Sequence, residues 1–374
     1  MACPHRPPCP GCPRFGEAGI PDDARAALAA LCAAEGLPPL AVVEGAPFGY
    51  RHRARLAVRG RAASPKIGIF QEGSHRVVDM PRCLVHHPLV NEVAAVAKEA
   101  VRRTRVAPYA DRPHRGLLRY VQVVVERPQG RAQIVLVAND QSPDALEPLA
   151  VEIERQLGPR LHSLWWNGNP DRTNTILGAS WHRWVGPDAV REQLGGAEVF
   201  FPPGAFGQSN LPLFERIVAQ VGHWIPDGAR VLEFHAGCGA IGLGLLGRVA
   251  HITFNEVAPP ALEGLAMGLA VRPASESARA TVLSGAAAAH VAAVRHADVV
   301  IADPPRRGLD DALLAALVAD PPALLIAISC NLETFLRDAH ALLASGRMRL
   351  AAAIPYALFP HTAHVETLAR FERV

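Results

Sequence analysis

Two hydrophobic patterns divide the chain. In residues 49–195, apolar side chains alternate with polar ones or form β-branched runs, at 53–59, 120–126 and 132–138. A Pro-Gln-Gly sequence separates the last two segments, which predicts a strand–turn–strand unit. With a helix expected over 144–156, this central region is predicted to be an α+β unit with an antiparallel sheet.

Residues 196–374 follow a different pattern, in which short apolar segments alternate with stretches of helical spacing. Strands are expected at 230–235, 251–256, 297–302 and 323–329, and helices directly after 235 and at 259–269, 310–318 and 332–343. This alternation predicts a parallel sheet with helices on both faces. Ligands of such sheets bind beyond the carboxyl ends of the strands, so polar motifs at those ends are candidates for a functional site.

The N-terminal region begins with a segment rich in cysteine and proline. Apolar residues at helical spacing follow it over 22–35. The chain is therefore expected to have three parts, namely an N-terminal cysteine segment with a helix (1–48), a central α+β domain (49–195) and a C-terminal α/β domain (196–374).

Composition narrows the setting of the protein. The 374 residues are 49% hydrophobic and 20% charged, which is typical of a globular protein. The start of the chain has no apolar core of the kind that a signal peptide needs, and no uncharged apolar stretch is long enough to span a bilayer. Seven cysteines without an export signal favour a reducing compartment over a disulfide framework. We therefore expect a cytoplasmic protein that makes no membrane contact.

The net charge of +3 says little, but basic residues are unevenly distributed. They gather at 51–55, 102–105 and 112–119, all in the central region. Clusters of this kind bind polyanions such as nucleic acids, and a solvated basic surface is the other interpretation of each one.

A glycine-rich turn follows the first expected strand of the C-terminal region. Gly237 and Gly239 let the backbone approach a ligand closely. The next strand ends in Glu256, about 20 residues after the turn, where a carboxylate can accept hydrogen bonds from ribose hydroxyls. The pair favours an adenosine-containing cofactor. A nicotinamide dinucleotide is disfavoured because the full G-x-G-x-x-G spacing is missing.

Two further polar motifs fall at strand ends. Asp303 opens Asp-Pro-Pro-Arg-Arg-Gly, whose two prolines fix a rigid turn, and Cys330 lies in Ser-Cys-Asn. A thiol at a strand end, directly before a helix N-terminus, is where a thiolate is expected to be electrostatically favoured. Cys32 and Cys238 have no such polar motif around them and are expected to be small buried apolar residues.

The remaining cysteines form a separate motif. Cys3, Cys9 and Cys12 have the spacing C-x5-C-x2-C, with Cys83 as a distant fourth. Four thiolates suit either a 4Fe–4S cluster or zinc, and spacing alone does not decide between them. Either group would join the N-terminal segment to the central region.

Four motifs together carry a resemblance to a known family. Asp-Pro-Pro-Arg-Arg-Gly (303–308), Ser-Cys-Asn (329–331), Ala-Phe-Gly-Gln-Ser-Asn (205–210) and Phe-Pro-His-Thr-Ala-His-Val-Glu (359–366) occur in the order and spacing of the RNA 5-methyluridine methyltransferases. The layout most resembles the branch that modifies 23S ribosomal RNA, lacks a TRAM domain and carries its cluster cysteines at the extreme N-terminus. The resemblance implies a Rossmann-like class I methyltransferase domain with a mostly parallel seven-stranded sheet, a smaller α+β RNA-binding domain and an N-terminal iron–sulfur segment.

The resemblance also implies a reaction, the S-adenosylmethionine (SAM)-dependent methylation of uridine carbon 5 in RNA. A thiolate adds to carbon 6 so that carbon 5 can attack the methyl sulfonium, and a base then removes the proton from carbon 5. Cys330 matches the nucleophile and Glu366 matches the base. The residues matched to the cofactor site are Gln208, His235, Glu256 and Asp303, beside the Gly237 turn. Phe206, Asn210 and Arg307 are placed near the cofactor or the flipped base, and the four cysteines are matched to a 4Fe–4S cluster.

The chain also departs from the family pattern. His235 stands where the family usually has an aromatic residue, Gly285-Ala286 replaces a more polar pair, and Leu332 follows Ser-Cys-Asn in place of proline. These departures leave open a catalytically weakened RNA-binding paralogue, and a small-molecule methyltransferase is a second alternative. The expected partner is RNA, ribosomal RNA being favoured over transfer RNA, with no obligatory protein partner evident.

Overall fold

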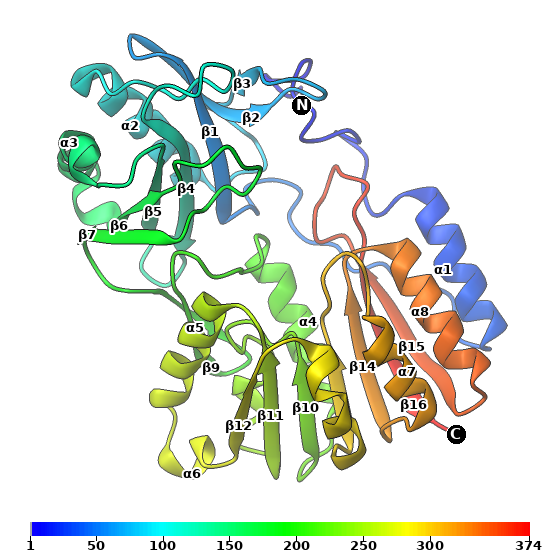
Figure 1. Cartoon of the computed structure of the whole chain (residues 1–374). Helices are drawn as coiled ribbons and strands as arrows, with labels where there is room; N and C mark the ends of the chain where they lie inside the picture. The colour runs from blue at the N-terminus through cyan, green and yellow to red at the C-terminus, as the bar shows by residue number, and fades with distance from the viewer. Residues whose placement is uncertain (1) are drawn as a thin grey trace.

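The computed structural model describes residues 2–374, and two seven-stranded sheets dominate it. One sheet belongs to the central region and the other to the C-terminal region, and they lie one above the other in Figure 1. The N-terminal segment runs from beside the central sheet down to the edge of the C-terminal sheet. None of the helices in residues 2–374 combines the length and the apolar character needed to cross a membrane.

The central sheet has the strand order β3-β2-β1-β4-β5-β6-β7. Its strands are β1 (Arg53–Arg61), β2 (Ser64–Phe70), β3 (Val77–Asp79), β4 (Leu118–Glu126), β5 (Arg131–Ala138), β6 (Leu161–Gly168) and β7 (Ser180–Val185). Neighbouring strands are antiparallel, as predicted, except for β5 and β6, which are parallel because helix α3 (Glu147–Leu157) connects them.

Helices α2 (Pro88–Thr104) and α3 cover the central sheet and complete its core. α2 begins where His87 accepts a hydrogen bond from the Leu89 amide and Pro88 occupies the first turn, and it ends at Arg105 in a left-handed conformation. Its apolar face buries Leu89, Val93 and Val101 among other residues, so the helix exists chiefly because the sheet covers that face.

The C-terminal sheet has the order β12-β11-β10-β13-β14-β16-β15. Its strands are β10 (Arg230–Phe234), β11 (His251–Glu256), β12 (Ala280–Ser284), β13 (Val299–Ala302), β14 (Leu324–Ser329), β15 (Met348–Tyr356) and β16 (Glu366–Arg373). The pairings from β12 to β14 are parallel, whereas β16 is antiparallel to both β14 and β15. The sheet is therefore mixed, and the expectation of a mostly parallel sheet is wrong. The antiparallel strands were not detected in the sequence because the β14–α8 alternation ends before them.

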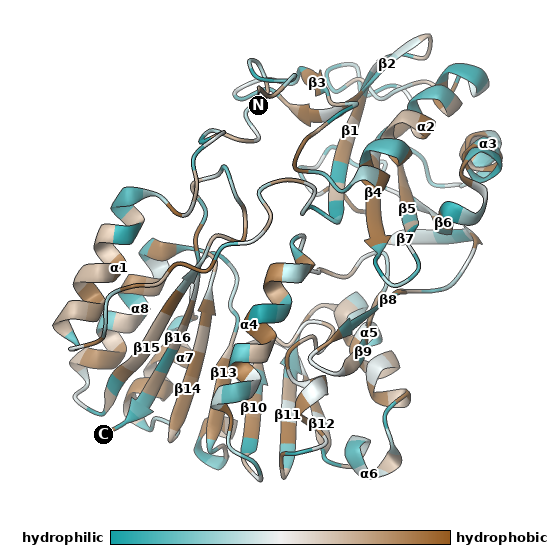
Figure 2. Ribbon diagram, turned by 180° about the vertical axis from the view of Figure 1, so that it is seen from behind, coloured by the Kyte–Doolittle hydropathy of each residue, from teal (hydrophilic) through white to brown (hydrophobic). Residues whose placement is uncertain are grey.

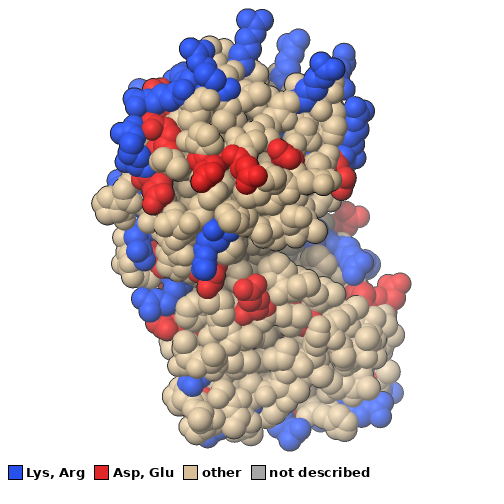
Figure 3. Space-filling view, turned by 60° about the vertical axis from the view of Figure 1, so that its left-hand side comes forward, with Lys and Arg blue, Asp and Glu red and all other residues tan. Residues whose placement is uncertain are grey.

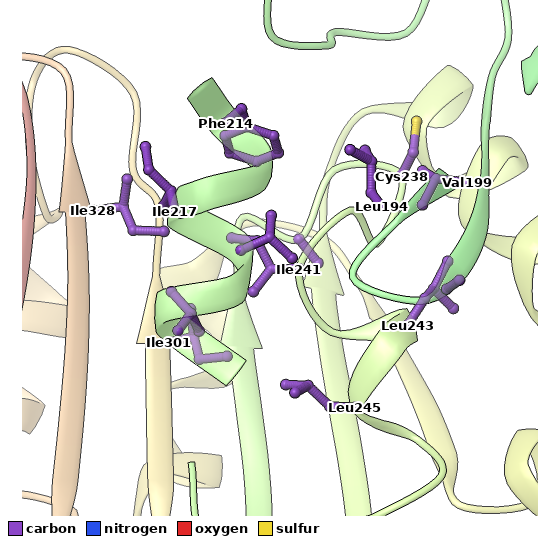
Figure 4. Packing of buried hydrophobic residues seen from close by; sticks show 14 of the residues in the cluster. Leu194, Val199, Phe214, Ile217, Cys238, Ile241, Leu243, Leu245, Ile301 and Ile328 are labelled. Atoms are coloured by element: carbon purple, nitrogen blue, oxygen red, sulfur yellow. The ribbon is translucent and has the colours of Figure 1, made fainter. Parts of the chain in front are cut away.

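Helices cover both faces of this sheet, as the alternation predicted. They are α1 (Asp22–Ala34), α4 (Leu211–Trp224), α5 (Pro259–Ala270), α6 (Ala274–Ser277), α7 (Asp311–Ala319) and α8 (Leu332–Ala344). One core lies between the sheet and α4, where Ile217 lies beside the strand residue Ile328 (Figure 4) and Phe214 and Ile301 belong to the same cluster. The other core joins α1, α7 and α8 to the opposite face, and the strands between the two cores are largely apolar (Figure 2).

Two local results differ from the sequence pattern. The helix expected after β10 is only a short 3-10 turn (Leu243–Leu245), because the glycines around it disfavour a regular helix. The hairpin of β8 (Val190–Leu194) and β9 (Ala197–Phe201) spans the expected boundary at 195/196, and its buried residues belong to the core around α4. The domain boundaries themselves remain predictions.

Candidate active site

The antiparallel strand β16 brings two of the predicted residues together. Ser329 at the end of β14 pairs with Thr367 near the start of β16. Cys330 follows Ser329 and Glu366 precedes Thr367, so the two side chains lie on adjacent strands one position beyond that pair. A carboxylate from a late part of the chain thereby reaches the carboxyl end of the parallel strands, where ligands of this fold bind.

Cys330 is half-buried at the mouth of a groove of about 850 Å³. The groove runs between α1 and α8, and its rim near the thiol carries Arg306, Asn331 and His364. Asn331 caps α8 by accepting hydrogen bonds from the Glu333 and Thr334 amides, which fixes the turn that presents Cys330. The thiol is thus held on a rigid turn while remaining open to a substrate.

The electrostatic expectation for Cys330 is wrong in direction. Burial raises the pKa of the thiol, the Glu366 and Asp303 carboxylates raise it further, and Arg306 only partly opposes them. The helix N-terminus does not outweigh two nearby negative charges and the loss of water. The resting form is therefore the thiol, and its proton must leave before the sulfur can attack.

Three carboxyl groups, which we call the carboxylate cluster, lie around the strand ends: Glu233, Asp303 and Glu366. Burial and the charge of Asp303 raise the pKa of Glu366, and burial raises that of Asp303 as well. Burial, followed by the Asp303 charge, raises the pKa of Glu233 to about 8. No Lys, Arg or His forms an ion pair with any of the three within residues 2–374. A buried carboxyl group in this state can take up or release a proton near neutral pH.

Most of the predicted cofactor residues line one cavity beside the carboxylate cluster. Gln208, His235, Gly237 and Asp303 contribute to its wall, and Phe206 and Phe214 add apolar surface. Nδ1 of His235 is buried and has no hydrogen-bond partner among the described residues, which leaves it free for a ligand. The cavity thus combines flat apolar surface with a few polar groups, as nucleotide-type ligands require.

The fifth residue, Glu256, lies behind the glycine turn. Its Oε2 accepts a hydrogen bond from the Gly237 amide at 2.8 Å, and its Oε1 accepts from the Val257 and Ala258 amides at 2.7 and 2.8 Å. Gly237 has φ +57°, and a Cβ there would have no atom within 4 Å, so the turn needs glycine for its conformation and leaves space on that side. Glu256 therefore shapes the turn and retains lone pairs for a ligand.

Phe206, Asn210 and Arg307, which the resemblance placed near the cofactor or the base, differ in where they lie. Phe206 is 70% exposed at the edge of the cofactor cavity. Asn210 is buried, caps α4, and donates a hydrogen bond from Nδ2 to the Leu358 carbonyl at 2.8 Å. Arg307 is exposed and lines neither the groove nor the cofactor cavity. Asn210 and Arg307 thus lie outside both spaces.

The central sheet supports the loop that carries Gln208. Arg53 of β1 donates a hydrogen bond to the Ala205 carbonyl at 2.5 Å, and Gln122 of β4 donates to the Pro203 carbonyl at 2.7 Å. The Ser209 carbonyl accepts from the His52 amide at 2.8 Å. One edge of the cofactor cavity is consequently held by the other sheet.

Comparison with known proteins places the chain in a family, although no protein-family model matches it. It is 34% identical over 381 residues to a protein of Protochlamydia amoebophila named as an uncharacterized RNA methyltransferase, and the match covers 100% of this chain and 98% of that protein. The chain belongs to the RNA methyltransferases. A second relative, from Parasynechococcus marenigrum and named likewise, is 31% identical over 87% of this chain and 71% of its own length.

The fold of this RNA methyltransferase is also found among solved structures. The Pyrococcus abyssi tRNA (uracil-54, C5)-methyltransferase in complex with S-adenosyl-L-homocysteine superposes with a TM-score of 0.76 at 24% identity. The match covers 93% of this chain and 81% of that one. This likeness shows a Rossmann-like class I methyltransferase fold.

Two features of the methyltransferase site were missed in the sequence. Glu233 is a single acidic residue inside the apolar Val-Leu-Glu-Phe strand, a signal that was available. Gly242 makes room for it, since a Cβ at position 242 would lie 2.2 Å from its Oε2. The support by Arg53 had no sequence signal, because it depends on contacts between two domains.

The cysteine segment of the methyltransferase folds back onto the central sheet. Cys3, Cys9, Cys12 and Cys83 all line one cavity of about 160 Å³. Burial and the neighbouring cysteines raise the pKa of Cys12 to about 11, so these thiols need a cation in order to ionise together. Residues 2–374 nevertheless contain no group of three or more His, Cys, Asp or Glu side chains placed to hold a single metal ion. The four cysteines thus share a cavity wall without forming a group that could hold a single metal ion.

Proposed function

We propose that this RNA methyltransferase methylates carbon 5 of a uridine through a covalent bond between Cys330 and carbon 6 of the base. The observation that carries the proposal is the pairing of β14 with β16, which brings Cys330, directly after β14, next to Glu366 at the start of β16 and near Asp303, a residue that lines the cofactor cavity. A nucleophile and a proton acceptor are the two groups that this reaction needs from the protein.

The residues divide the reaction between them. The Cys330 thiol first loses its proton to water in the groove that opens at it. Its sulfur then bonds to carbon 6, and the displaced electron pair makes carbon 5 nucleophilic. SAM, when bound, supplies an electrophilic methyl group to carbon 5. Glu366 then accepts the proton from carbon 5, and the electrons of that bond restore the ring double bond as the sulfur leaves. The raised pKa of Glu366 suits a group that must take a proton from carbon and return it to water.

The cofactor cavity fits SAM by the chemistry of its lining. Gln208, His235 and Asp303 would provide polar contacts, Gly237 the close backbone approach and Phe206 a flat apolar surface. Glu256 would accept from ribose hydroxyls while it holds the glycine turn.

We propose RNA contacts on the central domain, with ribosomal RNA favoured over transfer RNA. In Figure 3, Lys and Arg side chains gather over the central domain, and the other half of that face carries few of them. The exposed arginines of the expected clusters are Arg55, Arg102, Arg103, Arg105, Arg112 and Arg115. Arg119 does not belong to this surface, since it is buried and donates to the Asp171 carbonyl at 2.8 Å. Exposed arginines on one domain suit a polyanionic substrate.

We propose a 4Fe–4S cluster for the cysteine cavity, with zinc as the alternative occupant. The cavity of about 160 Å³ exceeds many times the roughly 10–15 Å³ that a single water needs. In a four-iron cluster each thiolate binds its own iron, so the ligands surround the group, and these four cysteines line the cavity. Anaerobic purification followed by iron, sulfide and zinc analysis tests this: four iron and four sulfide ions per chain are expected, and one zinc ion would contradict it.

The covalent step is tested with two variants and RNA from cells that lack this gene. Cys330→Ala should abolish methyl transfer from labelled SAM while leaving RNA affinity within about twofold, because only the nucleophile is removed. Glu366→Gln should accumulate a protein–RNA adduct that resists denaturant, since the proton on carbon 5 has no acceptor.

Two outcomes would contradict the proposal. Methylation by Cys330→Ala at the wild-type rate would exclude the covalent mechanism. RNA binding by the wild-type chain without any methyl transfer would instead favour the weakened RNA-binding paralogue. Mapping 5-methyluridine by mass spectrometry in RNA with and without the gene identifies the modified nucleotide.

A further inference from the structure

The loop that precedes Glu366 is held by residues from outside the C-terminal sheet. We call residues 357–365 the catalytic loop. The Arg14 amide donates a hydrogen bond to the His361 carbonyl at 3.0 Å, and the Gly16 amide donates to Nδ1 of the His361 ring at 3.4 Å. The rings of Phe15 and Phe48 each lie 5.1 Å from the His361 ring and 6.0 Å from each other, measured between centroids. Phe15, Phe48 and His361 therefore form one unit, which we call the aromatic bracket.

Three more contacts hold the same loop. Two come from Tyr50 and Arg51, and the third comes from Asn210 at the start of α4. The Tyr50 hydroxyl donates to the Pro360 carbonyl at 3.2 Å, and the Arg51 guanidinium lies over the Phe359 ring at 5.7 Å. Asn210 donates to the Leu358 carbonyl at 2.8 Å. The loop is thus fixed through its backbone and its rings, and few of these contacts come from the sheet whose strands it connects.

The backbone conformation of His361 depends on these contacts. Its φ is +68°, a left-handed conformation that a residue with a Cβ rarely adopts, and the residue is only 5% exposed. Such a conformation persists only where the surroundings determine it. The contacts from Arg14, Phe15 and Phe48 are those surroundings, and Glu366 follows five residues later in the chain.

The same N-terminal residues also border the substrate groove. Arg14 and Glu17 line the groove that opens at Cys330, and the catalytic loop contributes Ala363, His364 and Val365 to it. The segment that holds the loop is therefore also a wall of the space in which the base must be placed.

We propose that Phe15 and Phe48 are positioning residues, which act through His361 to hold Glu366 where it can remove the proton from carbon 5. This inference rests on the proposed role of Glu366 as the base. Loss of the bracket should leave Cys330 on its own rigid turn, so the covalent bond still forms while its release becomes slow. A variant that lacks the bracket should therefore turn over more slowly and accumulate more of the covalent protein–RNA adduct.

The experiment compares Phe15→Ala and His361→Gly with the wild-type chain. His361→Gly removes the ring but permits the left-handed backbone, so a loss there is due to the missing contacts. Turnover should fall by roughly 10- to 100-fold, as expected for a displaced catalytic group, with RNA and S-adenosylhomocysteine affinities almost unchanged. Denaturant-resistant adduct with RNA from cells lacking the gene should rise, and amide hydrogen exchange in 357–365 should become faster.

Two controls keep the inference testable. Phe15→Tyr retains the ring and should restore turnover, and Trp184→Ala removes a half-buried ring from the distant strand β7 and should affect neither adduct nor exchange in the loop. Wild-type turnover in Phe15→Ala, or lost turnover without adduct, would overturn the inference. If Glu366→Gln itself yields no adduct, the proposed function fails instead, whatever the bracket variants do.

Discussion

The two sheets of this protein bury charge in opposite ways. In the central region, two buried or half-buried arginines are neutralised by carboxylates: Arg59 meets Asp111 at 2.7 Å and Arg127 meets Glu192 at 2.8 Å, whereas the buried Arg119 donates to backbone carbonyls. In the C-terminal domain, Glu233 and Glu366 are each 2% exposed and form no ion pair within the part of the chain that the structure describes. Both sheets have seven strands and a buried apolar core on each, so the difference does not come from a missing core.

This difference distinguishes the central sheet, which acts as a scaffold, from the C-terminal sheet, which carries the proposed reaction site. A buried ion pair fixes a geometry and keeps both groups charged over a wide pH range. A buried carboxyl group without a cation is costly when ionised, and its pKa rises toward neutrality. The central domain thus has fixed charges, and the C-terminal domain has groups that can exchange protons.

The largest expected effect on activity comes from replacing the Asp303 carboxylate with an amide. Asp303→Asn removes a negative charge beside Glu366, so the pKa of Glu366 should fall. The base form is lost as pH drops through that pKa, and the rising limb of the pH–kcat profile should therefore move to lower pH. Since Asp303 also lines the cofactor cavity, kcat/KM for SAM should fall by roughly 100-fold. Initial rates between about pH 5 and pH 9 measure both effects.

Asp111→Asn is the matched control in the central domain. It leaves Arg59 buried without its carboxylate, and should lower the free energy of unfolding by roughly 1–3 kcal/mol. Its kcat and pH profile should remain those of the wild type. A shift of the profile in Asp111→Asn equal to that in Asp303→Asn would show that the comparison between the domains is wrong.

A further effect, on stability and confined to high pH, is expected for Glu233→Gln. The pKa of Glu233 is raised from 4.5 to about 8, so the folded state binds more protons than the unfolded state between these values. Its contribution makes the protein less stable as pH rises through this window. Glu233→Gln should therefore gain roughly 1–4 kcal/mol relative to the wild type at pH 8, and little at pH 4.5. Urea denaturation measures this, and Glu263→Gln, at an exposed position of α5, should show no such pH dependence.

The smallest effect is expected where the domains meet. Arg53→Gln removes the hydrogen bond to the Ala205 carbonyl and loosens the loop that carries Gln208. Affinity for S-adenosylhomocysteine, measured by calorimetry, should fall by about three- to tenfold. Arg61→Gln, at the exposed end of the same strand, should leave it unchanged. Equal affinities in Arg53→Gln and the wild type would mean that the central sheet does not support the cofactor site.

Local patterns in the sequence predicted only part of both sheets. Three central strands, four C-terminal strands and helices α3, α5, α7 and α8 were expected, whereas α2, α4 and the remaining strands of the two sheets were not. The expected strand at 251–256 and the helix at 259–269 agree with β11 and α5 almost to the residue, because period and turn chemistry are local properties. The seven strands of the C-terminal sheet were inferred through family resemblance, and the direction of β16 was not. A strand's own residues do not record which neighbour it pairs with.

The residues of the candidate site could be predicted from the sequence, but their contacts in the folded chain could not. Motifs at strand ends led to Cys330, which lines the groove, and to Asp303 and Gly237, which line the cofactor cavity. The raised pKa of Cys330 was not predictable, because it arises from carboxylates that approach only in the folded chain. The bracket around His361 was missed for the same reason, since Phe15 lies 346 positions earlier in the sequence.

The placement of β16 has a consequence for how the molecule matures. It follows every other strand of its sheet in chain order, so a nascent polypeptide acquires the proposed nucleophile before the proposed proton acceptor. Until β16 pairs with β14 and β15, Cys330 has no neighbouring strand that carries Glu366, so a chain without β16 lacks the group proposed to remove the proton from carbon 5 after methyl transfer. Completing the sheet and completing the proposed pair of reacting groups are, in this topology, the same folding event.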